Sequence, residues 1–217
     1  NDIKTSGRKK FTYSKELYNF SNLRAKEYAN KNNSDYFCLT KTKWLGNYAP
    51  CYHKLYVYEL LKRYNKVFYL DSDAIITKYC PNIFKLDDLS ATKDCANTIA
   101  GNKRTIRKNE IHNLPLEHQY FCSGIILFNQ RFYKKTKKYW REELTKWKDI
   151  KNAQHDQSVF NVLVGKYYGK FNVLEYDWGA HWKRGKYIVH YGNPKPKLEF
   201  SKTIERFFKY ENSISPC

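Results

Sequence analysis

The sequence contains no methionine, no CxxC pair and no long apolar run. No stretch approaches the roughly 20 apolar residues of a membrane-spanning helix, which argues against a transmembrane segment. No signal-peptide pattern opens the chain, and the missing methionine leads us to expect an excised or processed piece of a longer protein. No internal repeat or Pro/Gly/Ser-rich linker divides the 217 residues. We therefore expect a single domain over residues 1–217.

The cysteines are scattered and show neither metal-ligand spacing nor a redox motif. They are Cys38, Cys51, Cys80, Cys95, Cys122 and Cys217. Isolated thiols are typical of reducing compartments, so the sequence favours a cytoplasmic protein. A Golgi lumen location is the alternative if an N-terminal anchor has been removed.

Acidic residues are scarce, with 21 against 40 basic residues, and the formal net charge is +19. Such a charge suggests an anionic partner, and a basic nucleic-acid-binding module is one hypothesis. Lysines far outnumber arginines, however, whereas base-reading sites favour arginine. We therefore expect no nucleic-acid partner, while an anionic small substrate or an anionic membrane surface remains open.

Hydrophobic periodicity in the first third of the chain predicts alternating helices and strands. Leu17, Phe20, Leu23 and Tyr28 have helical spacing within residues 14–31. The expected elements are a helix over 14–31, a buried strand over 35–40, a helix over 49–64 beginning near Pro50, and a strand over 66–70. This order indicates an α/β sheet.

The remainder of the chain shows an irregular, charged stretch followed by further strands and helices. The expected elements are an irregular segment over 77–115, a strand over 119–129, an amphipathic helix over 130–147, a short helix over 157–165, and late strands over 171–178 and 186–191. The residues from 195 to 217 form a basic and aromatic tail.

Two aspartates, Asp71 and Asp73, interrupt the apolar segment "KVFYLDSDAII" at the end of a predicted strand. Carboxylates at positions i and i+2 of a strand point the same way and repel one another. A divalent cation relieves this repulsion, and ligands bind at the carboxyl ends of strands in open α/β sheets. The alternative is a turn whose charges are balanced by solvent.

Five segments, taken in order, resemble one enzyme family. They are "HKLYVYELLKRYNKVFYL", "YLDSDAII", "FCSGIILFN", "HDQSVFN" and "IVHYGNPKP". Together they are similar to the glycogenin and lipopolysaccharide galactosyltransferase family and to xyloglucan xylosyltransferases, which are nucleotide-sugar glycosyltransferases. The resemblance implies a GT-A (Rossmann-like) α/β fold with a mixed, mostly parallel sheet flanked by helices. Cys122 stands where the family has an asparagine.

The resemblance also implies roles for individual residues. The implied metal ligands are Asp71, Asp73 and His190; the implied donor-binding residues are Asp71, Lys54, Gly192 and Lys195; and the implied catalytic residues are Asp156 and Gln157. The implied cation is Mn²⁺ or Mg²⁺. Each role has a structural alternative: a hydrogen-bonded strand histidine, solvated lysines, and a helix-capping aspartate.

The function implied by the resemblance is metal-dependent transfer of a sugar from a UDP-sugar to a glycan or protein-linked acceptor, with retention of anomeric configuration. A noncatalytic carbohydrate-binding relative is a further hypothesis beside the nucleic-acid module. Glycosyltransferases rich in lysine, asparagine and tyrosine occur in large DNA viruses and in AT-rich microbes. A viral origin would place the protein in a host cytoplasm.

Overall fold

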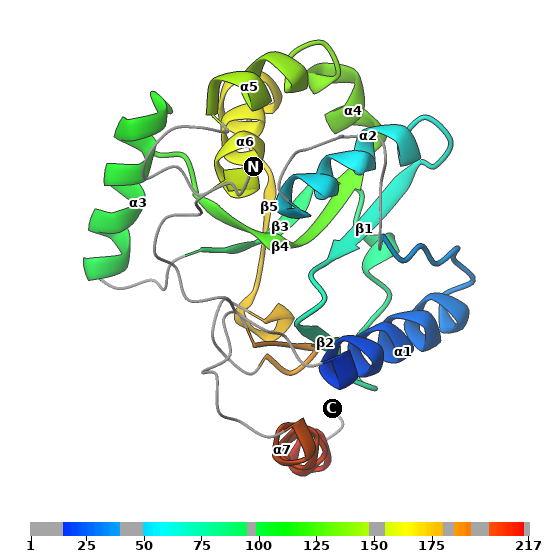
Figure 1. Cartoon of the computed structure of the whole chain (residues 1–217). Coiled ribbons are helices and arrows are strands. Elements are labelled where there is room, and N and C mark those ends of the chain that lie inside the picture. Colours follow the sequence, from blue (N-terminus) through cyan, green and yellow to red (C-terminus); the bar gives the residue numbers. More distant parts are fainter. Residues whose placement is uncertain are drawn as a thin grey trace, which may run out of the picture.

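The structure, a computed structural model, describes residues 15–39, 50–94, 99–147, 155–179, 185–191 and 200–214. Both helices and strands occur along these residues (Figure 1). Their order is α1 (Lys15–Lys31), the 3-10 helix η2 (Pro50–Tyr56), α2 (Val57–Leu60), β1 (Lys66–Leu70), β2 (Ala74–Ile76), the 3-10 helix η3 (Ile83–Lys85), β3 (Ser90–Lys93), α3 (Ile99–His112), β4 (Phe121–Asn129), α4 (Gln130–Thr136), α5 (Trp140–Trp147), α6 (His155–Leu163), the π-helix η4 (Val164–Tyr168), β5 (Asn172–Leu174), the 3-10 helix η5 (Tyr176–Trp178), β6 (Ile188–His190) and α7 (Phe200–Ser213).

The described strands form two sheets. The larger sheet has the order β1-β4-β3-β5, and the smaller one pairs β2 with β6. Strand β4 runs antiparallel to both β1 and β3, whereas β3 and β5 are parallel. Strands β1, β3 and β5 therefore point the same way and only β4 opposes them, which agrees with the predicted mixed, mostly parallel sheet.

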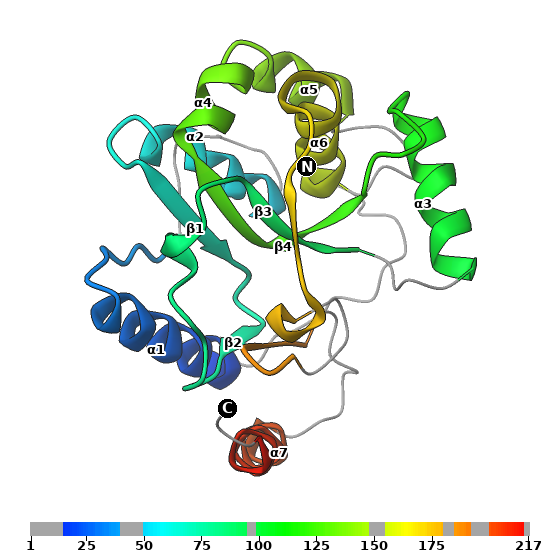
Figure 2. The same ribbon diagram turned by 180° about the vertical axis from the view of Figure 1, so that it is seen from behind.

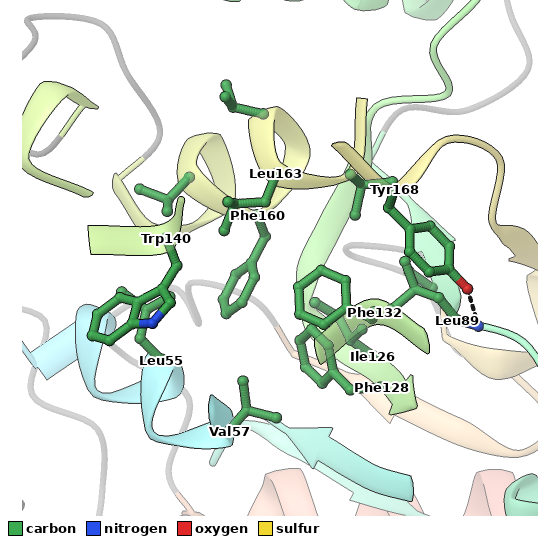
Figure 3. Packing of buried hydrophobic residues seen from close by; sticks show 14 of the residues in the cluster. Leu55, Val57, Leu89, Ile126, Phe128, Phe132, Trp140, Phe160, Leu163 and Tyr168 are labelled. Carbon is green, nitrogen blue, oxygen red and sulfur yellow. Dashed lines mark hydrogen bonds between the residues drawn. The ribbon is translucent and has the colours of Figure 1, made fainter. Parts of the chain in front are cut away.

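Strand β4 is buried along its whole length because helices or loops cover both of its faces. Its residues alternate between two hydrophobic clusters. Ile126 and Phe128 pack beneath α2, α4 and α6 (Figure 3). Ile125 and Leu127 pack on the opposite face, with Tyr28 of α1. This arrangement explains why the segment reads as a continuous apolar run rather than an alternating one.

The small sheet is held between two helices at one end of the molecule. Leu17 of α1, Ile75 of β2, Val189 of β6 and Phe207 of α7 form a third hydrophobic cluster. Figure 2 shows α1 and α7 beside this sheet, away from α4 and α5. The tail that the sequence showed only as basic and aromatic therefore contains a packed helix.

The strand predicted over 35–40 is wrong for its described part, because residues 35–39 adopt no regular structure. No backbone ladder pairs these residues with any described strand. Their side chains instead contact neighbouring elements: the Tyr36 hydroxyl donates to Asn22 Oδ1 at 2.6 Å, and the Phe37 ring packs on the Tyr64 ring at 5.5 Å. Thr40 lies outside the described residues.

The irregular segment predicted over 77–115 is also wrong, since it contains η3, β3 and α3. Strand β3 is only four residues long, and its sequence "SATK" has no strong strand pattern. It forms because it pairs with β4 on one side and β5 on the other. Helix α3 was not predicted because the residues on its buried face are polar, so no apolar stripe marks the face that packs against the protein.

Two predicted helices are each divided in the structure. The segment from Pro50 winds first as a 3-10 helix and then as a short α-helix. The helix predicted over 130–147 is broken between α4 and α5. Near the break, the Thr136 hydroxyl donates to the Phe132 carbonyl at 2.7 Å, a contact that often bends a helix.

The late strands are shorter than predicted. The segment over 171–178 contains β5 and then turns into the 3-10 helix η5, while the segment over 186–191 contains β6. Trp178, which ends η5, is buried in a hydrophobic cluster.

Candidate functional site

The two aspartates lie in a tight turn rather than on a strand, which corrects the predicted geometry. Strand β1 ends at Leu70, and the Asp71 amide donates to the Gly124 carbonyl at 2.8 Å. The Ala74 amide then donates to the Asp71 carbonyl at 3.0 Å, which closes a turn before β2 begins. The turn anchors Asp71 to β4 and Asp73 to the start of the small sheet.

His190 reaches Asp73 through the pairing of β2 with β6. Ala74 pairs with His190 in this sheet, and the Tyr191 amide donates to the Asp73 carbonyl at 2.9 Å. As a result, His190 Nε2 lies 3.4 Å from Asp73 Oδ1, and both side chains are buried. One ligand atom from each of Asp71, Asp73 and His190 lies within 4.8 Å of the others. This set of two carboxylates and one imidazole is the one expected from the sequence.

Gly124 of β4 makes room for this cluster. A Cβ at position 124 would lie 2.7 Å from Asp71 Oδ2 and 2.7 Å from His190 Cε1, which is too close for any side chain. Only glycine allows the carboxylate and the imidazole to approach the strand backbone in this way. The donor atoms and the space beside them fit a hard divalent cation.

Lys54 joins Asp71 to the start of helix α6. Its Nζ lies 3.0 Å from Asp71 Oδ1 and 2.9 Å from Asp156 Oδ2. It also donates to Ser123 Oγ at 3.1 Å and lies 5.2 Å from the centre of the Tyr69 ring. Because the lysine is buried, these contacts replace the hydration that its ammonium group has lost.

Asp156 and Gln157 both face β4 from the first turn of α6. Ser123 Oγ donates to Asp156 Oδ2 at 2.5 Å, and the Ser123 amide donates to Gln157 Oε1 at 3.4 Å. Helix α6 begins at His155, so Asp156 lies inside the first turn instead of preceding it as a cap. Its carboxylate is directed to Ser123 and Lys54.

The buried charges of the site shift one another's pKa values. Burial lowers the pKa of Lys54, but Asp156 and Asp71 outweigh burial and hold it well above its usual range. Burial likewise lowers the pKa of His190, but Asp73 and the Cys122 thiol raise it overall, to about 10. The pKa of Asp73 is lowered because His190 outweighs the effect of burial. The site therefore holds Lys54 and His190 charged against three carboxylates.

A cavity of about 750 Å³ opens beside the two aspartates. It extends between α1, residues 33–39 and β1, and its aromatic lining residues are Tyr18, Tyr28, Tyr36, Phe37, Tyr64, Phe68, Tyr69 and Phe84. The volume is within the range of small-molecule and cofactor sites. Asp71 and Asp73 thus stand at the edge of a space large enough for an organic ligand.

Gly192 and Lys195 lie outside the described residues. The structure brings together the other sequence-predicted residues: Asp71, Asp73 and His190 in one cluster, with Lys54, Asp156 and Gln157 beside it. Sequence reasoning missed Ser123, Gly124 and Tyr69 as members of the site. A signal for Ser123 and Gly124 was present, since "SG" interrupts the apolar strand "FCSGIILFN".

The fold defines the class of protein. The galactosyltransferase LgtC, solved with donor and acceptor sugar analogues, is 18% identical and superposes with a TM-score of 0.54 over 76% of this chain and 67% of LgtC. An active-site glutamine-to-glutamate mutant of LgtC gives 17% identity and a TM-score of 0.53 over 76% of this chain and 68% of LgtC. The shared architecture is the GT-A fold.

The family is shown by its sequence model. The model described as glycosyl transferase family 8 matches residues 2–196, and the chain belongs to this family. It is therefore a glycosyltransferase of the GT-A fold. The bifunctional glycosyltransferase WbbM is also similar, with 20% identity over 75% of this chain but only 30% of WbbM, and a TM-score of 0.45. None of the curated proteins matches the sequence.

Proposed function

We propose that this glycosyltransferase transfers a sugar from a UDP-sugar to a glycan or protein-linked acceptor with the help of a divalent cation, Mn²⁺ or Mg²⁺. The convergence of Asp71, Asp73 and His190 against the bare backbone of Gly124 carries the proposal. Oxygen ligands from carboxylates with one imidazole nitrogen suit Mn²⁺ in particular. When bound, such a cation would neutralise the negative charge that grows on a departing diphosphate.

Cation binding at this site would be coupled to proton release. His190 is protonated next to Asp73 at neutral pH, because its pKa is raised to about 10. An imidazole binds a metal only in its neutral form, so the incoming cation must displace the His190 proton.

The donor nucleotide is assigned to the cavity beside the aspartates. The aromatic lining of the cavity supports stacking of a nucleobase, and Asp71, which also lines it, is proposed to accept a hydrogen bond from the ribose. Gly192 and Lys195 stay predictions from the resemblance: a close backbone approach and a positive charge next to the diphosphate.

Asp156 and Gln157 are proposed to act at the donor sugar or at the acceptor, with the anomeric configuration retained. Their support is their position, held by Ser123 and Lys54 on the first turn of α6 and next to the cation ligands. The active-site glutamine named for LgtC makes Gln157 the natural residue to vary beside Asp156. Lys54 is proposed to fix the Asp71 and Asp156 carboxylates in addition to its expected role at the donor.

The described residues include no helix that is long and apolar enough to cross a bilayer. Cytoplasmic location stays a prediction from the scattered cysteines. We propose no nucleic-acid partner, because lysines far outnumber arginines in the sequence, whereas base-reading sites favour arginine.

Calorimetric titration with UDP, with and without Mn²⁺, tests the proposal. The parent protein should bind UDP tightly only when Mn²⁺ is present. Asp73→Asn should not bind UDP tightly even with Mn²⁺, because it keeps the shape of the side chain but removes its charge. Asp87→Asn is the matched control, since it removes a carboxylate from an exposed side chain.

Two outcomes would overturn the assignment. UDP binding that is equally tight without any divalent cation would remove the metal from the proposal. Cation-dependent UDP binding without turnover of any UDP-sugar, even to water, would favour a noncatalytic carbohydrate-binding relative.

A further inference from the structure

Helix α3 carries its apolar side chains on the outside. Ile99, Ile106 and Ile111 are 80%, 43% and 42% exposed, whereas the residues that the helix buries are Lys108, Asn109 and His112. A surface helix of a globular protein ordinarily has the opposite pattern, with an apolar face towards the core. The isoleucines of α3 therefore contribute little to the attachment of the helix to the protein.

Polar contacts attach the inner face of α3 instead. Lys108 forms an ion pair with Asp94 at the end of β3, and Asn109 Nδ2 donates to the His118 carbonyl at 2.8 Å. The His112 ring lies 4.8 Å from the Trp147 ring. These contacts fix the orientation of the helix, so the outward position of the isoleucines is a property of the folded protein.

The outward apolar residues form a patch together with the loop that follows the helix. Ile99 and Ile106 are seven residues apart and share one face of α3. Ile106 and Leu116, which is 61% exposed, line the same surface hollow of about 370 Å³. We call Ile99, Ile106 and Leu116 the α3 patch. Figures 1 and 2 both show α3 at the edge of the molecule, distant from α1 and α7.

Basic side chains are exposed on the same helix as the α3 patch, and Lys103 and Arg107 lie on the side of the helix next to Ile99 and Ile106. Lys103, Arg104 and Arg107 are exposed on the helix, against one exposed acidic residue, Glu110. Apolar residues beside lysine and arginine are the pattern of helices that lie in the interface of an anionic membrane. Such a surface offers hydrocarbon to the isoleucines and negative headgroups to the basic residues. A nucleic acid would satisfy the charges but not the apolar side chains.

We propose that α3 docks this protein on an anionic membrane surface, with the α3 patch in the interface and Lys103 and Arg107 against the lipid headgroups. The contact is peripheral and lies outside the residues assigned to sugar transfer. It would hold the enzyme at a membrane, where acceptors attached to lipids or to membrane proteins are concentrated.

Co-sedimentation with lipid vesicles tests the proposal. The parent protein should bind vesicles of phosphatidylcholine containing about one third phosphatidylglycerol much more strongly than phosphatidylcholine alone, and about 0.5 M salt should weaken binding. Ile99→Ser/Ile106→Ser should lower the partition coefficient about tenfold or more, because two apolar side chains no longer leave water. Lys103→Gln/Arg107→Gln should lower it by a similar factor on anionic vesicles.

Matched controls separate α3 from general effects of charge and apolar surface. Leu23→Ser/Val173→Ser removes two exposed aliphatic side chains elsewhere, and Lys134→Gln/Lys138→Gln removes two exposed charges near α4. Both controls should partition within about twofold of the parent protein. Melting temperature and UDP binding should be unchanged in the α3 variants, which shows that they fold.

The proposal is overturned if the parent protein does not bind anionic vesicles, or if the α3 variants bind them as strongly as the parent does. It is also overturned if light scattering shows a dimer that Ile99→Ser/Ile106→Ser dissociates while vesicle binding is absent. The α3 patch would then be the contact between two copies of this chain.

Discussion

Lys54 and Lys108 are both buried, yet their surroundings differ in charge. Lys108 forms an ion pair with Asp94 and lies 4.8 Å from the centre of the Tyr120 ring. Lys54 contacts two carboxylates, Asp71 and Asp156, and a third, that of Asp73, belongs to the same cluster. The first arrangement matches one positive charge with one negative charge. The second brings three carboxylates together around Lys54 and His190.

The difference indicates which buried lysine serves a structural role and which a functional one. In a buried ion pair with equal and opposite charges, the attraction between the two charges offsets the free energy of their desolvation. Removing one of the two residues therefore affects mainly folding. An excess of negative charge in a buried site is unfavourable until a cation arrives, and it grows when His190 loses its proton to become a ligand. The surroundings of Lys54 are therefore those of a binding site, and those of Lys108 are those of a helix anchor.

Replacing Lys54 should have the largest effect, because it damages both folding and activity. Lys54→Met leaves Asp71 and Asp156 facing one another without their shared cation, which should cost about 3–5 kcal/mol of unfolding free energy. Turnover per folded molecule should fall at least about 100-fold, since both carboxylates lose their fixed positions. Mn²⁺ should restore part of the lost stability in a denaturant titration.

Lys54→Met with unchanged turnover, or with a stability loss that Mn²⁺ does not reduce, would contradict the functional interpretation of this cluster. Lys54→Arg is a useful companion, because it keeps the charge but not the compact ammonium geometry that fits between three oxygens.

Replacing Asp156 should affect activity more than stability. Asp156→Asn preserves the shape of the side chain and can still accept the Ser123 hydrogen bond, so the stability loss should be about 1–2 kcal/mol. A carboxylate that acts at the sugar or acceptor contributes to the barrier, and kcat should fall about 100-fold or more with donor binding nearly retained. Turnover within about threefold of the parent, at saturating donor, would leave Asp156 with a structural role only.

Replacing Lys108 should affect stability alone. Lys108→Met removes the ammonium group that pairs with the buried Asp94 carboxylate and should cost about 3–5 kcal/mol of unfolding free energy. Turnover per folded molecule at a temperature below the transition should equal that of the parent. Lys108→Met/Asp94→Asn should recover part of the loss, because the second change removes the buried negative charge that Lys108 balanced. A large drop in kcat in the single variant would erase the contrast with Lys54.

The sequence was sufficient to predict the cluster of two aspartates and one histidine and the longest buried strand. Asp71, Asp73 and His190 were predicted as one cluster from the resemblance of five segments to a glycosyltransferase family, and ligand atoms of the three residues lie within 4.8 Å of one another. The apolar run ending in Asn129 was predicted as a strand because burial on both faces leaves an unbroken apolar pattern. The register that places His190 beside Asp73 could not be predicted, since it depends on pairing between strands distant in the sequence.

The sequence was uninformative where tertiary contacts outweigh local pattern. Helix α3 buries Lys108 and Asn109, which no rule of hydrophobic periodicity detects. The segment over 35–39 has the composition of a strand, but it pairs with no described strand. Gly124 was part of a recognised strand, but its role depends on how closely Asp71 and His190 approach it, and only coordinates reveal that distance.

The smallest expected effect is a dependence of stability on pH that arises near Lys108 and not at the sugar-transfer site. Burial lowers the pKa of His112 below its usual range, and the nearby charges of Lys108 and Lys166 add to this, against the Lys108 carbonyl, which raises it. Burial also lowers the pKa of His118, although its hydrogen bond with Asn161 opposes the shift.

The unfolded chain therefore binds protons at these histidines more readily than the folded protein does. The contribution of these two histidines to stability should be complete above the unfolded pKa of about 6.5 and should be lost progressively as the pH falls below it. Lys108→Met should make this loss between about pH 7 and 5 slightly smaller, because protonated His112 no longer faces the lysine ammonium. Unfolding free energies from urea titrations at several pH values measure the difference between the parent and Lys108→Met. Because the raised pKa of His190 contributes equally to both proteins, it cancels in this difference. A difference between the two proteins that does not change between pH 7 and 5 would contradict the effect of Lys108 on His112.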